Sequence, residues 1–314
     1  MEFIPQDKLL KVKADTLKVI RDEINLGKPG EMKSAVKILK EWVQQQPYFK
    51  KKDFDEHFLE TAIISGKGSI ERAKKQIDRV CTLKSLWPQF FGVRDIRKEF
   101  ADIFSIGHFG VLPEVNENNH RVFVAQVNGN ILHSSQLFNY YRYAICIGEY
   151  MKTHDYYVSY HYIVDLRQTD MTAFLAACNP IEMKQALTIL IECYGIRFKG
   201  LHFITNSKHL IDMLITILKQ ILKPKIIQRL HHHATCDGLA NLIGKDYLPV
   251  ELGGTAASMQ DIHDKWVEVL SSKENMEYLR AMDDVGTNEA LRPGVQFNDE
   301  YAGVTGTFRF LSVD

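Results

Sequence analysis

Residues 197–233, RFKGLHFITNSKHLIDMLITILKQILKPKIIQRLHHH, hold in one stretch the alternation on which the fold assignment rests. Residues 200–205 (GLHFIT) and 230–235 (LHHHAT) are short strand candidates. Residues 207–222 between them are predicted to be helical, because apolar residues recur there at helical spacing. A strand, a helix and a second strand predict a crossover unit with parallel strands.

The same alternation extends toward the N-terminus. Residues 121–127 (RVFVAQV) and 156–166 (YYVSYHYIVDL) are rich in β-branched and aromatic residues, and residues 134–152 and 170–194 are predicted helices. The chain therefore reads as an α/β protein with a mainly parallel sheet. Residues 1–95 show helical periodicity only, with Ser69 as a helix cap, and a single helix capped by Ser258 is predicted over 258–282. These patterns divide the chain into a helical domain (1–95), an α/β domain (96–257) and a C-terminal helix and tail (258–314).

The most apolar segment is the predicted helix at residues 210–222, LIDMLITILKQIL. Its polar residues Asp212, Thr216, Lys219 and Gln220 lie at helical offsets that form one narrow stripe. The segment is too short and too interrupted to span a bilayer. Two interpretations remain open from the pattern alone: a buried core helix, or a lid over an apolar cavity.

Basic residues flank this apolar helix. Arg197 and Lys199 precede the strand at 200–205 and share a direction if that segment is extended, whereas Lys225 and Arg229 follow the helix and share a face if helical. Such a cluster fits an anionic membrane surface or a phosphorylated headgroup, and the alternative is an ordinary solvated face.

The histidine triplet at 231–233 permits a metal interpretation. His231 and His233 would share one face of a strand, a spacing that can hold a metal ion, but a third ligand would have to come from a distant residue. The alternative is that these histidines form hydrogen bonds at a strand end.

Composition excludes several function classes. The 314 residues carry 39 Lys+Arg against 39 Asp+Glu, and this balance argues against a dedicated nucleic-acid-binding protein. Five scattered cysteines without a CxxC pair predict reduced thiols, and the charged N-terminus is unlike a signal peptide. We expect a soluble intracellular protein. The sequence lacks the motifs GxxxxGK[ST], GxGxxG, GxSxG and HExxH. Their absence argues against common nucleotide-binding and hydrolase sites.

Four segments in order resemble the CRAL-TRIO lipid-binding family, and within it the branch of tocopherol-transfer and retinaldehyde-binding proteins. Residues 162–166 (YIVDL) resemble the family's strand-ending IFDLEG, and residues 248–254 (LPVELGG) resemble its LPxEYGG. Residues 197–204 (RFKGLHFI) and 225–233 (KIIQRLHHH) match the segments between them, the latter on the family's IHxHG strand. The tail at 303–314 resembles insect members.

The resemblance implies a helical N-terminal domain, an α/β lipid-binding domain, and a mobile gate helix at 210–222 over one hydrophobic ligand. It also implies a phosphoinositide-binding basic cleft at Arg197, Lys199, Lys225 and Arg229. The histidine strand then favours hydrogen bonding over a metal site. The ligand-binding positions that it implies are Tyr160, Tyr162, Val164, Ala186, Ile189, Leu190, Tyr194, Phe198 and Leu201, with the gate residues Leu210, Leu214, Ile217, Leu218 and Ile221.

The resulting expectation is a monomeric, cytoplasmic carrier without enzymatic activity, metal or cofactor, which associates peripherally with anionic membranes. Its cargo would be one retinoid, carotenoid, tocopherol or similar lipid, and two tyrosines in the floor imply a ligand with one polar end. A phospholipid or phosphatidylinositol sensor or exchange protein is the first alternative. A metal-dependent enzyme built on His231 and His233 is the remote one.

Overall fold

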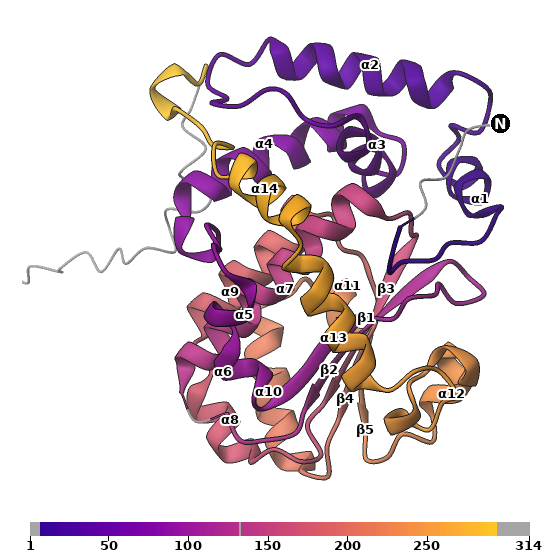
Figure 1. The fold of residues 1–314 in the computed structure, drawn as a ribbon, viewed down its shortest axis with the longest axis vertical. Helices are drawn as coiled ribbons and strands as arrows, with labels where there is room; N and C mark the ends of the chain where they lie inside the picture. Colours follow the sequence, from indigo (N-terminus) through magenta and orange to yellow (C-terminus); the bar gives the residue numbers. More distant parts are fainter. Residues whose placement is uncertain (1–6, 132, 294–314) are drawn as a thin grey trace, which may run out of the picture.

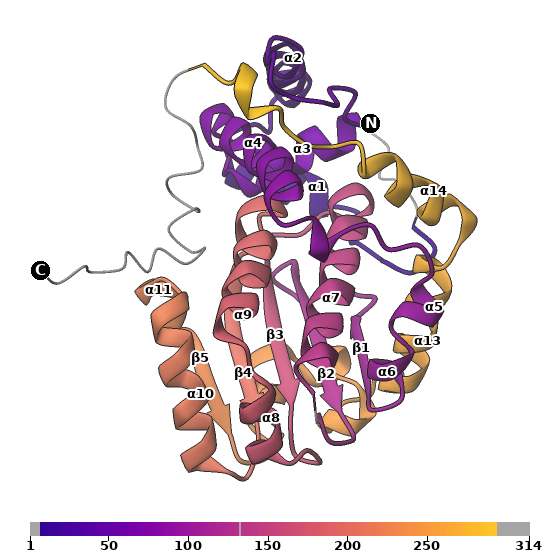
Figure 2. The same cartoon turned by 90° about the vertical axis from the view of Figure 1, so that its left-hand side faces the viewer.

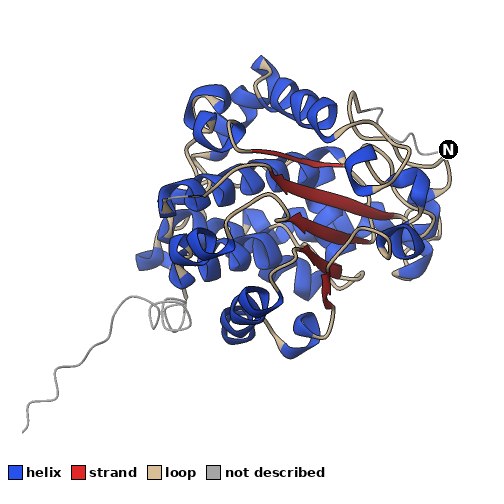
Figure 3. Cartoon of the chain, turned by 90° about the horizontal axis from the view of Figure 1, so that it is seen from below, coloured by secondary structure: helices blue, strands red, loops and turns tan. Residues whose placement is uncertain are grey.

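A five-stranded sheet forms the centre of the molecule in the computed structural model, which describes residues 7–131 and 133–293. The strands follow chain order across the sheet, and only β1 runs antiparallel to its neighbour. Figure 3 shows them side by side, with the progressive rotation typical of twisted sheets. The strands are β1 (Gly107–Val111), β2 (His120–Val127), β3 (Ser159–Asp165), β4 (Phe198–Ile204) and β5 (Leu230–His233). The predicted α/β architecture with a mainly parallel sheet is confirmed.

Three crossover connections join the parallel strands, and all of them pass over the same face of the sheet (Figure 2). One face is thus covered by a layer of helices, which we call the helical face. The opposite face is called the back face. The crossover helices are α7 (Ser134–His154), α8 (Met171–Ala177), α9 (Pro180–Thr188), α10 (Lys208–Ile221) and α11 (Pro224–Ile227).

The helix predicted over 170–194 is divided into shorter segments. Asn179 caps α9 by accepting hydrogen bonds from the amides of Ile181 and Glu182, and Pro180 occupies the first turn. Proline has no amide hydrogen, so it begins a helix and cannot continue one. The chain then runs into one π-helical turn, Ile189–Cys193.

The first strand, β1, is not apparent from the sequence. Its residues, GHFGV, include two glycines and lack the apolar alternation typical of a strand. Gly110 is required by packing, because a Cβ there would lie 2.5 Å from Cδ1 of Trp266. The indole Nε1 of that tryptophan donates to the carbonyl of Val111 at 2.8 Å and holds a C-terminal helix against the strand.

The N-terminal region is entirely helical apart from isolated bridges, as its periodicity predicts, and lies across one end of the sheet (Figure 1). Ser69 accepts a hydrogen bond from the Arg72 amide, which confirms the predicted cap. The helices here are α1 (Thr16–Glu23), α2 (Glu31–Gln44), α3 (Glu56–Ser65) and α4 (Ile70–Leu86), followed by the short α5 (Ile96–Glu99) and α6 (Ala101–Phe104).

The C-terminal region contains two long helices where one was predicted. Ser258 caps α13 (Met259–Leu270) as expected, but the chain turns at Ser271. Ser272 then accepts a hydrogen bond from the Asn275 amide and begins α14 (Lys273–Met282). A new N-cap inside an apparently continuous pattern ends the first helix. The short α12 (Leu239–Ile243) precedes them, and the predicted insect-like tail at 303–314 lies outside the described residues.

Candidate functional site

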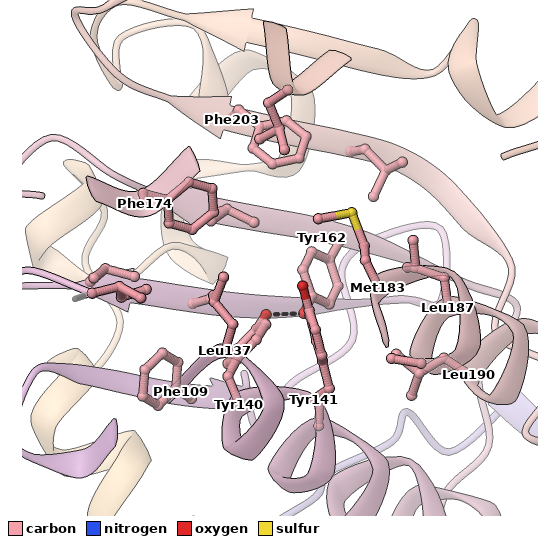
Figure 4. Close-up of a pocket in the computed structure, with 18 of the residues that line it drawn as sticks. Phe109, Leu137, Tyr140, Tyr141, Tyr162, Phe174, Met183, Leu187, Leu190 and Phe203 are labelled. Carbon is pink, nitrogen blue, oxygen red and sulfur yellow. Dashed lines mark hydrogen bonds between the residues drawn. The ribbon is translucent and has the colours of Figure 1, made fainter. Parts of the chain in front are cut away.

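An apolar cavity lies between the helical face of the sheet and the crossover helices (Figure 4). Its volume is about 120 Å³. That is smaller than the roughly 300–1,000 Å³ of pockets that hold drug-sized ligands. Its lining is apolar apart from one glutamine and three tyrosines, and contains no charged residue: Ile103, Ile106, Phe109, Ala125, Val127, Ile131, Gln136, Leu137, Tyr140, Tyr141, Ala144, Tyr162, Val164, Phe174, Met183, Ala186, Leu187, Leu190, Phe198, Leu201, Phe203, Leu214, Leu218 and Leu222.

The floor of the cavity follows from strand alternation. Tyr162 and Val164 on β3 face the helices, and Leu201 and Phe203 do so on β4. The side chains between them in sequence, His161 and His202 among others, belong to the back face. A single period-two pattern thus separates an apolar floor from a histidine-bearing reverse side.

Two tyrosines meet at the floor. The hydroxyl of Tyr140, from α7, and that of Tyr162, from β3, form a hydrogen bond (Figure 4). The Tyr162 ring stacks on Phe123 with centroids 4.6 Å apart, which fixes its orientation. Burial raises the pKa of both phenols, so both are neutral hydrogen-bonding groups at physiological pH.

Helix α10 covers one side of the cavity. Leu214 and Leu218 point into the lining, and Leu222 follows the helix end. The predicted polar stripe is exposed to solvent, as helical geometry requires. On the outer side, Met213 is 48% exposed, so the helix also presents apolar surface to solvent.

The residues implied by the family resemblance fall into two groups. The following line the cavity: Tyr162, Val164, Ala186, Leu190, Phe198, Leu201, Leu214 and Leu218. The following are buried or half-buried but do not line it: Tyr160, Ile189, Tyr194, Leu210, Ile217 and Ile221.

Tyr160 shows why alternation alone was insufficient. It shares a face with Tyr162, but its ring packs on Tyr157 at 4.6 Å, beyond the end of the cavity. There the guanidinium of Arg121 donates twice to Asp155, at 2.5 and 2.8 Å, and both side chains are fully buried. We call this ion pair the end wall. Tyr194 is likewise engaged elsewhere, since its hydroxyl donates to Glu149 at 2.5 Å.

Sequence reasoning missed the contribution of α7. Its residues Leu137, Tyr140, Tyr141 and Ala144 form a helical stripe at spacings of three and four, and all line the cavity. That spacing was readable from the sequence. The residues from α6, β1 and α8 depended on tertiary packing and gave no comparable signal.

The four basic residues lie near the N-terminal ends of β4 and β5. The carbonyl of Arg229 accepts from the Leu201 amide at 2.8 Å, and its guanidinium donates to the Phe198 carbonyl, between Arg197 and Lys199. Arg197 is half-buried, and this burial lowers its pKa despite the nearby Glu23.

Two expectations about the local geometry change. Helix α11 ends at Ile227, so Arg229 follows the helix instead of sharing its face with Lys225. Lys199 has no partner on β3, because the register passes from Phe198 to Gly200 at a bulge. Lys199 and Lys225 are both exposed. Helix α11, which carries Lys225, follows directly after α10 (Figure 2).

The back face carries a row of imidazoles, which we call the histidine row: His120, His161, His202, His231 and His233. Nδ1 of His161 lies 3.1 Å from Nε2 of His202, and Nδ1 of His202 lies 3.1 Å from Nε2 of His233. Burial, reinforced by neighbouring histidines, lowers the pKa of His161 to about 4 and that of His202 to about 3.

Hydrogen bonds engage two histidines of the triplet, His232 and His233, whereas His231 stacks on His202. His232 lies 2.8 Å from the Thr205 carbonyl, while His231 and His233 belong to the row. Within residues 7–131 and 133–293, no group of three or more His, Cys, Asp or Glu side chains is placed to hold a metal ion.

Comparison with known families fits this architecture. A family model described as the CRAL/TRIO domain matches residues 107–254, from β1 to the turn after β5 and α12. Those residues form a CRAL/TRIO domain. The CRAL/TRIO family comprises lipid-binding and lipid-transfer proteins. The matched range includes the four basic residues and all of the cavity lining except Ile103 and Ile106.

Similar proteins cover the chain to different extents. Clavesin-1 of Rattus norvegicus is 36% identical over 78 residues, or 24% of this chain and 22% of clavesin-1. Clavesin-1 of Xenopus laevis is 37% identical over 78 residues, or 24% and 23% respectively. The chain thus matches about a fifth of the length of these relatives. The crystal structure of Sfh5 superposes with a TM-score of 0.51 over 87% of this chain and 98% of Sfh5, at 12% identity, and shares the fold.

No helix in the described ranges has both the length and the apolar character needed to cross a bilayer.

Proposed function

We propose that this protein binds one hydrophobic molecule in the cavity beneath α10 and transfers it between membranes. The observation that carries the proposal is the uncharged, almost wholly apolar lining of a cavity built mainly from the residues of the CRAL/TRIO domain. The cargo is a retinoid, carotenoid, tocopherol or similar lipid, as for the tocopherol-transfer and retinaldehyde-binding branch that the sequence resembles.

Burial of the cargo explains why such a carrier needs a membrane to release it. Each buried CH₂ contributes about 0.8 kcal/mol, so a lipid of roughly 20 carbons gains about 16 kcal/mol before ordering costs. Spontaneous release into water is therefore slow. A membrane offers an apolar environment and removes most of that barrier.

Uptake requires the cavity to expand. About 120 Å³ is close to a cavity that holds a benzene-sized molecule, so a longer lipid must displace part of the lining. We propose α10 as that part. Its inner contacts come from Ile211, Leu214 and Leu218, whereas Leu210 and Ile217 are only half-buried. Its outward-displaced apolar surface would enter the headgroup region of a bilayer.

The basic cluster supplies the docking step in this proposal. Anionic lipid, phosphoinositide above all, would bind near Arg197, Lys199, Lys225 and Arg229, and each charge near such a surface contributes about 1 kcal/mol. Because α10 joins the cluster through α11, docking would act directly on the C-terminal end of the moving helix.

Charge reversal tests the docking step. Lys199→Glu combined with Lys225→Glu changes exposed side chains, so we expect the fold to persist and transfer to phosphoinositide-containing vesicles to slow by about tenfold or more. Lys265→Glu on α13, also exposed, is the matched control and should transfer at the wild-type rate. Equal rates for all three proteins would refute phosphoinositide-assisted docking.

Native mass spectrometry with organic extraction tests the cargo. One neutral isoprenoid lipid per protein chain is the expected result. Extraction of a phospholipid at unit stoichiometry would replace this proposal with a phospholipid-binding sensor or exchange protein.

A further inference from the structure

The polar groups of the cavity are few, and two of them are already paired. Among the described lining residues, Gln136 and the three tyrosines alone carry side-chain oxygen or nitrogen, and the Tyr140 and Tyr162 hydroxyls bond to each other. Besides Gln136 and Tyr141, the polar groups that a ligand meets are therefore the two bonded hydroxyls on the floor (Figure 4).

The pair retains unused hydrogen-bonding capacity. Each phenol has one O–H donor and acceptor lone pairs. When one hydroxyl donates to the other, the accepting tyrosine still holds its own O–H, and the donating tyrosine still has an acceptor site. The pair can thus donate to a carbonyl oxygen, or both donate to and accept from a ligand hydroxyl.

The same geometry offers nothing to a charged ligand group. None of the described lining residues is Lys, Arg or His. In the end wall beyond the cavity, the Arg121 guanidinium is already engaged, because it donates to both oxygens of Asp155 and to the Pro113 carbonyl. A buried carboxylate or phosphate without a cation is strongly disfavoured.

We infer that the Tyr140–Tyr162 hydroxyl pair recognises the single neutral oxygen group, hydroxyl or carbonyl, of the cavity's ligand. The inference rests on the proposed function and narrows it, because it selects lipid alcohols and aldehydes over carboxylates and plain hydrocarbons. Tyr140 and Tyr162 are then the specificity-determining residues of the cavity.

A set of probes with one chain length isolates the polar end. Hexadecanol, hexadecanal, palmitate and hexadecane compete with Nile red, a neutral fluorescent dye, for the full-length protein at pH 7.4. The wild type should bind the alcohol and the aldehyde about tenfold more tightly than hexadecane, as expected for one net buried hydrogen bond, and palmitate more weakly than the alcohol.

Variants that remove the hydroxyls locate the effect. Tyr140→Phe, Tyr162→Phe and their combination should reduce alcohol and aldehyde affinity toward that of hexadecane, while hexadecane affinity stays constant. Tyr160→Phe is the matched control, because this buried tyrosine lies two residues away on the same strand and outside the lining. It should bind all four probes as the wild type does.

The outcomes separate the two proposals. Two results overturn the inference that the hydroxyl pair recognises the ligand and leave the proposed carrier function intact. One is equal binding of hexadecane and hexadecanol by the wild type, and the other is a preference for hexadecanol that persists in the double variant. Palmitate binding as tight as hexadecanol also overturns it. If neither the dye nor any probe enters the cavity, the proposed function fails together with the inference.

Discussion

On the helical face of the sheet, Tyr162, Val164 and Leu201 leave a space unfilled, whereas on the back face His161 and His202 bond to each other. Both faces arise from the same strands by alternation. The helical face is nearly free of polar groups and keeps a void, although a void forfeits dispersion contacts. On the back face, hydrogen bonds join His161, His202 and His233, whereas the buried Nδ1 of His120 has no hydrogen-bond partner.

This contrast shows how one sheet can bind a ligand on one face while the other face contributes to stability. A face whose polar groups are already paired has little to offer a ligand. A face with a cavity and one hydroxyl pair has both room and residual hydrogen-bonding capacity. The following predictions test that separation, in order of decreasing effect.

The largest effect is expected at the end wall. Asp155→Ala leaves the fully buried Arg121 guanidinium without its carboxylate, and should lower the free energy of unfolding by about 3–5 kcal/mol. Urea denaturation measures the change. The control is Glu41→Ala, which removes an exposed ion pair with Lys37 and should change the value by less than about 0.5 kcal/mol. Equal losses in both variants would mean that the end wall contributes no more than a surface pair.

The next effect concerns pH and the histidine row. An unfolded histidine binds a proton near pH 6.5, whereas burial holds the pKa of His161 at about 4 in the folded state. Between these values the unfolded state binds more protons, so stability rises with pH. We therefore expect Tm to be insensitive to this group above pH 6.5 and to fall as the pH drops toward 4.

His161→Gln isolates this contribution from the carboxylates that titrate nearby. The variant should lose less stability than the wild type between pH 6.5 and 4, by about 2 kcal/mol at pH 5. Thermal melts across this range supply the measurement. Identical pH profiles for the two proteins would contradict the assignment of acid sensitivity to the row.

Adjacent residues on β3 offer the most direct comparison of the two faces. Val164→Phe adds volume toward the cavity and should change stability by less than about 1 kcal/mol while blocking Nile red binding. Ile163→Phe adds volume on the opposite side of the strand, where the side chain is fully buried, and should cost about 1–3 kcal/mol. If Val164→Phe destabilised the protein more than Ile163→Phe, the unfilled space would lie on the back face, which contradicts a cavity on the helical face.

The architecture was predictable where the signal is local. The β-branched runs and the helical stripe of α10 depend on residues within a few positions, and both were confirmed. Strand β1 gave no such signal, because Gly107 and Gly110 serve tertiary packing. The break between α13 and α14 depends on a single serine cap at Ser272.

The sequence predicted on which face of the sheet the site residues lie, but not which of them line the cavity. Alternation placed Tyr160 and Tyr162 on one face, and only the packing of α7 against β3 decides that Tyr162 lines the cavity. The histidine row likewise depends on tertiary structure. His231 and His233 were visible in the sequence, but their contact with His202 depends on the register between β4 and β5.

The position of β5 has a consequence for how motion is distributed through the molecule. It forms one edge of the described sheet, pairs only with β4 and is four residues long, and α10 is attached between these two strands. Amides in short edge elements exchange with solvent through small local openings, whereas those in central strands require nearly global unfolding. The displacement of α10 proposed for ligand uptake would therefore be confined to the least protected margin of the protein. The central strands β2 and β3, which include Tyr162 of the cavity floor, would keep their hydrogen bonds throughout.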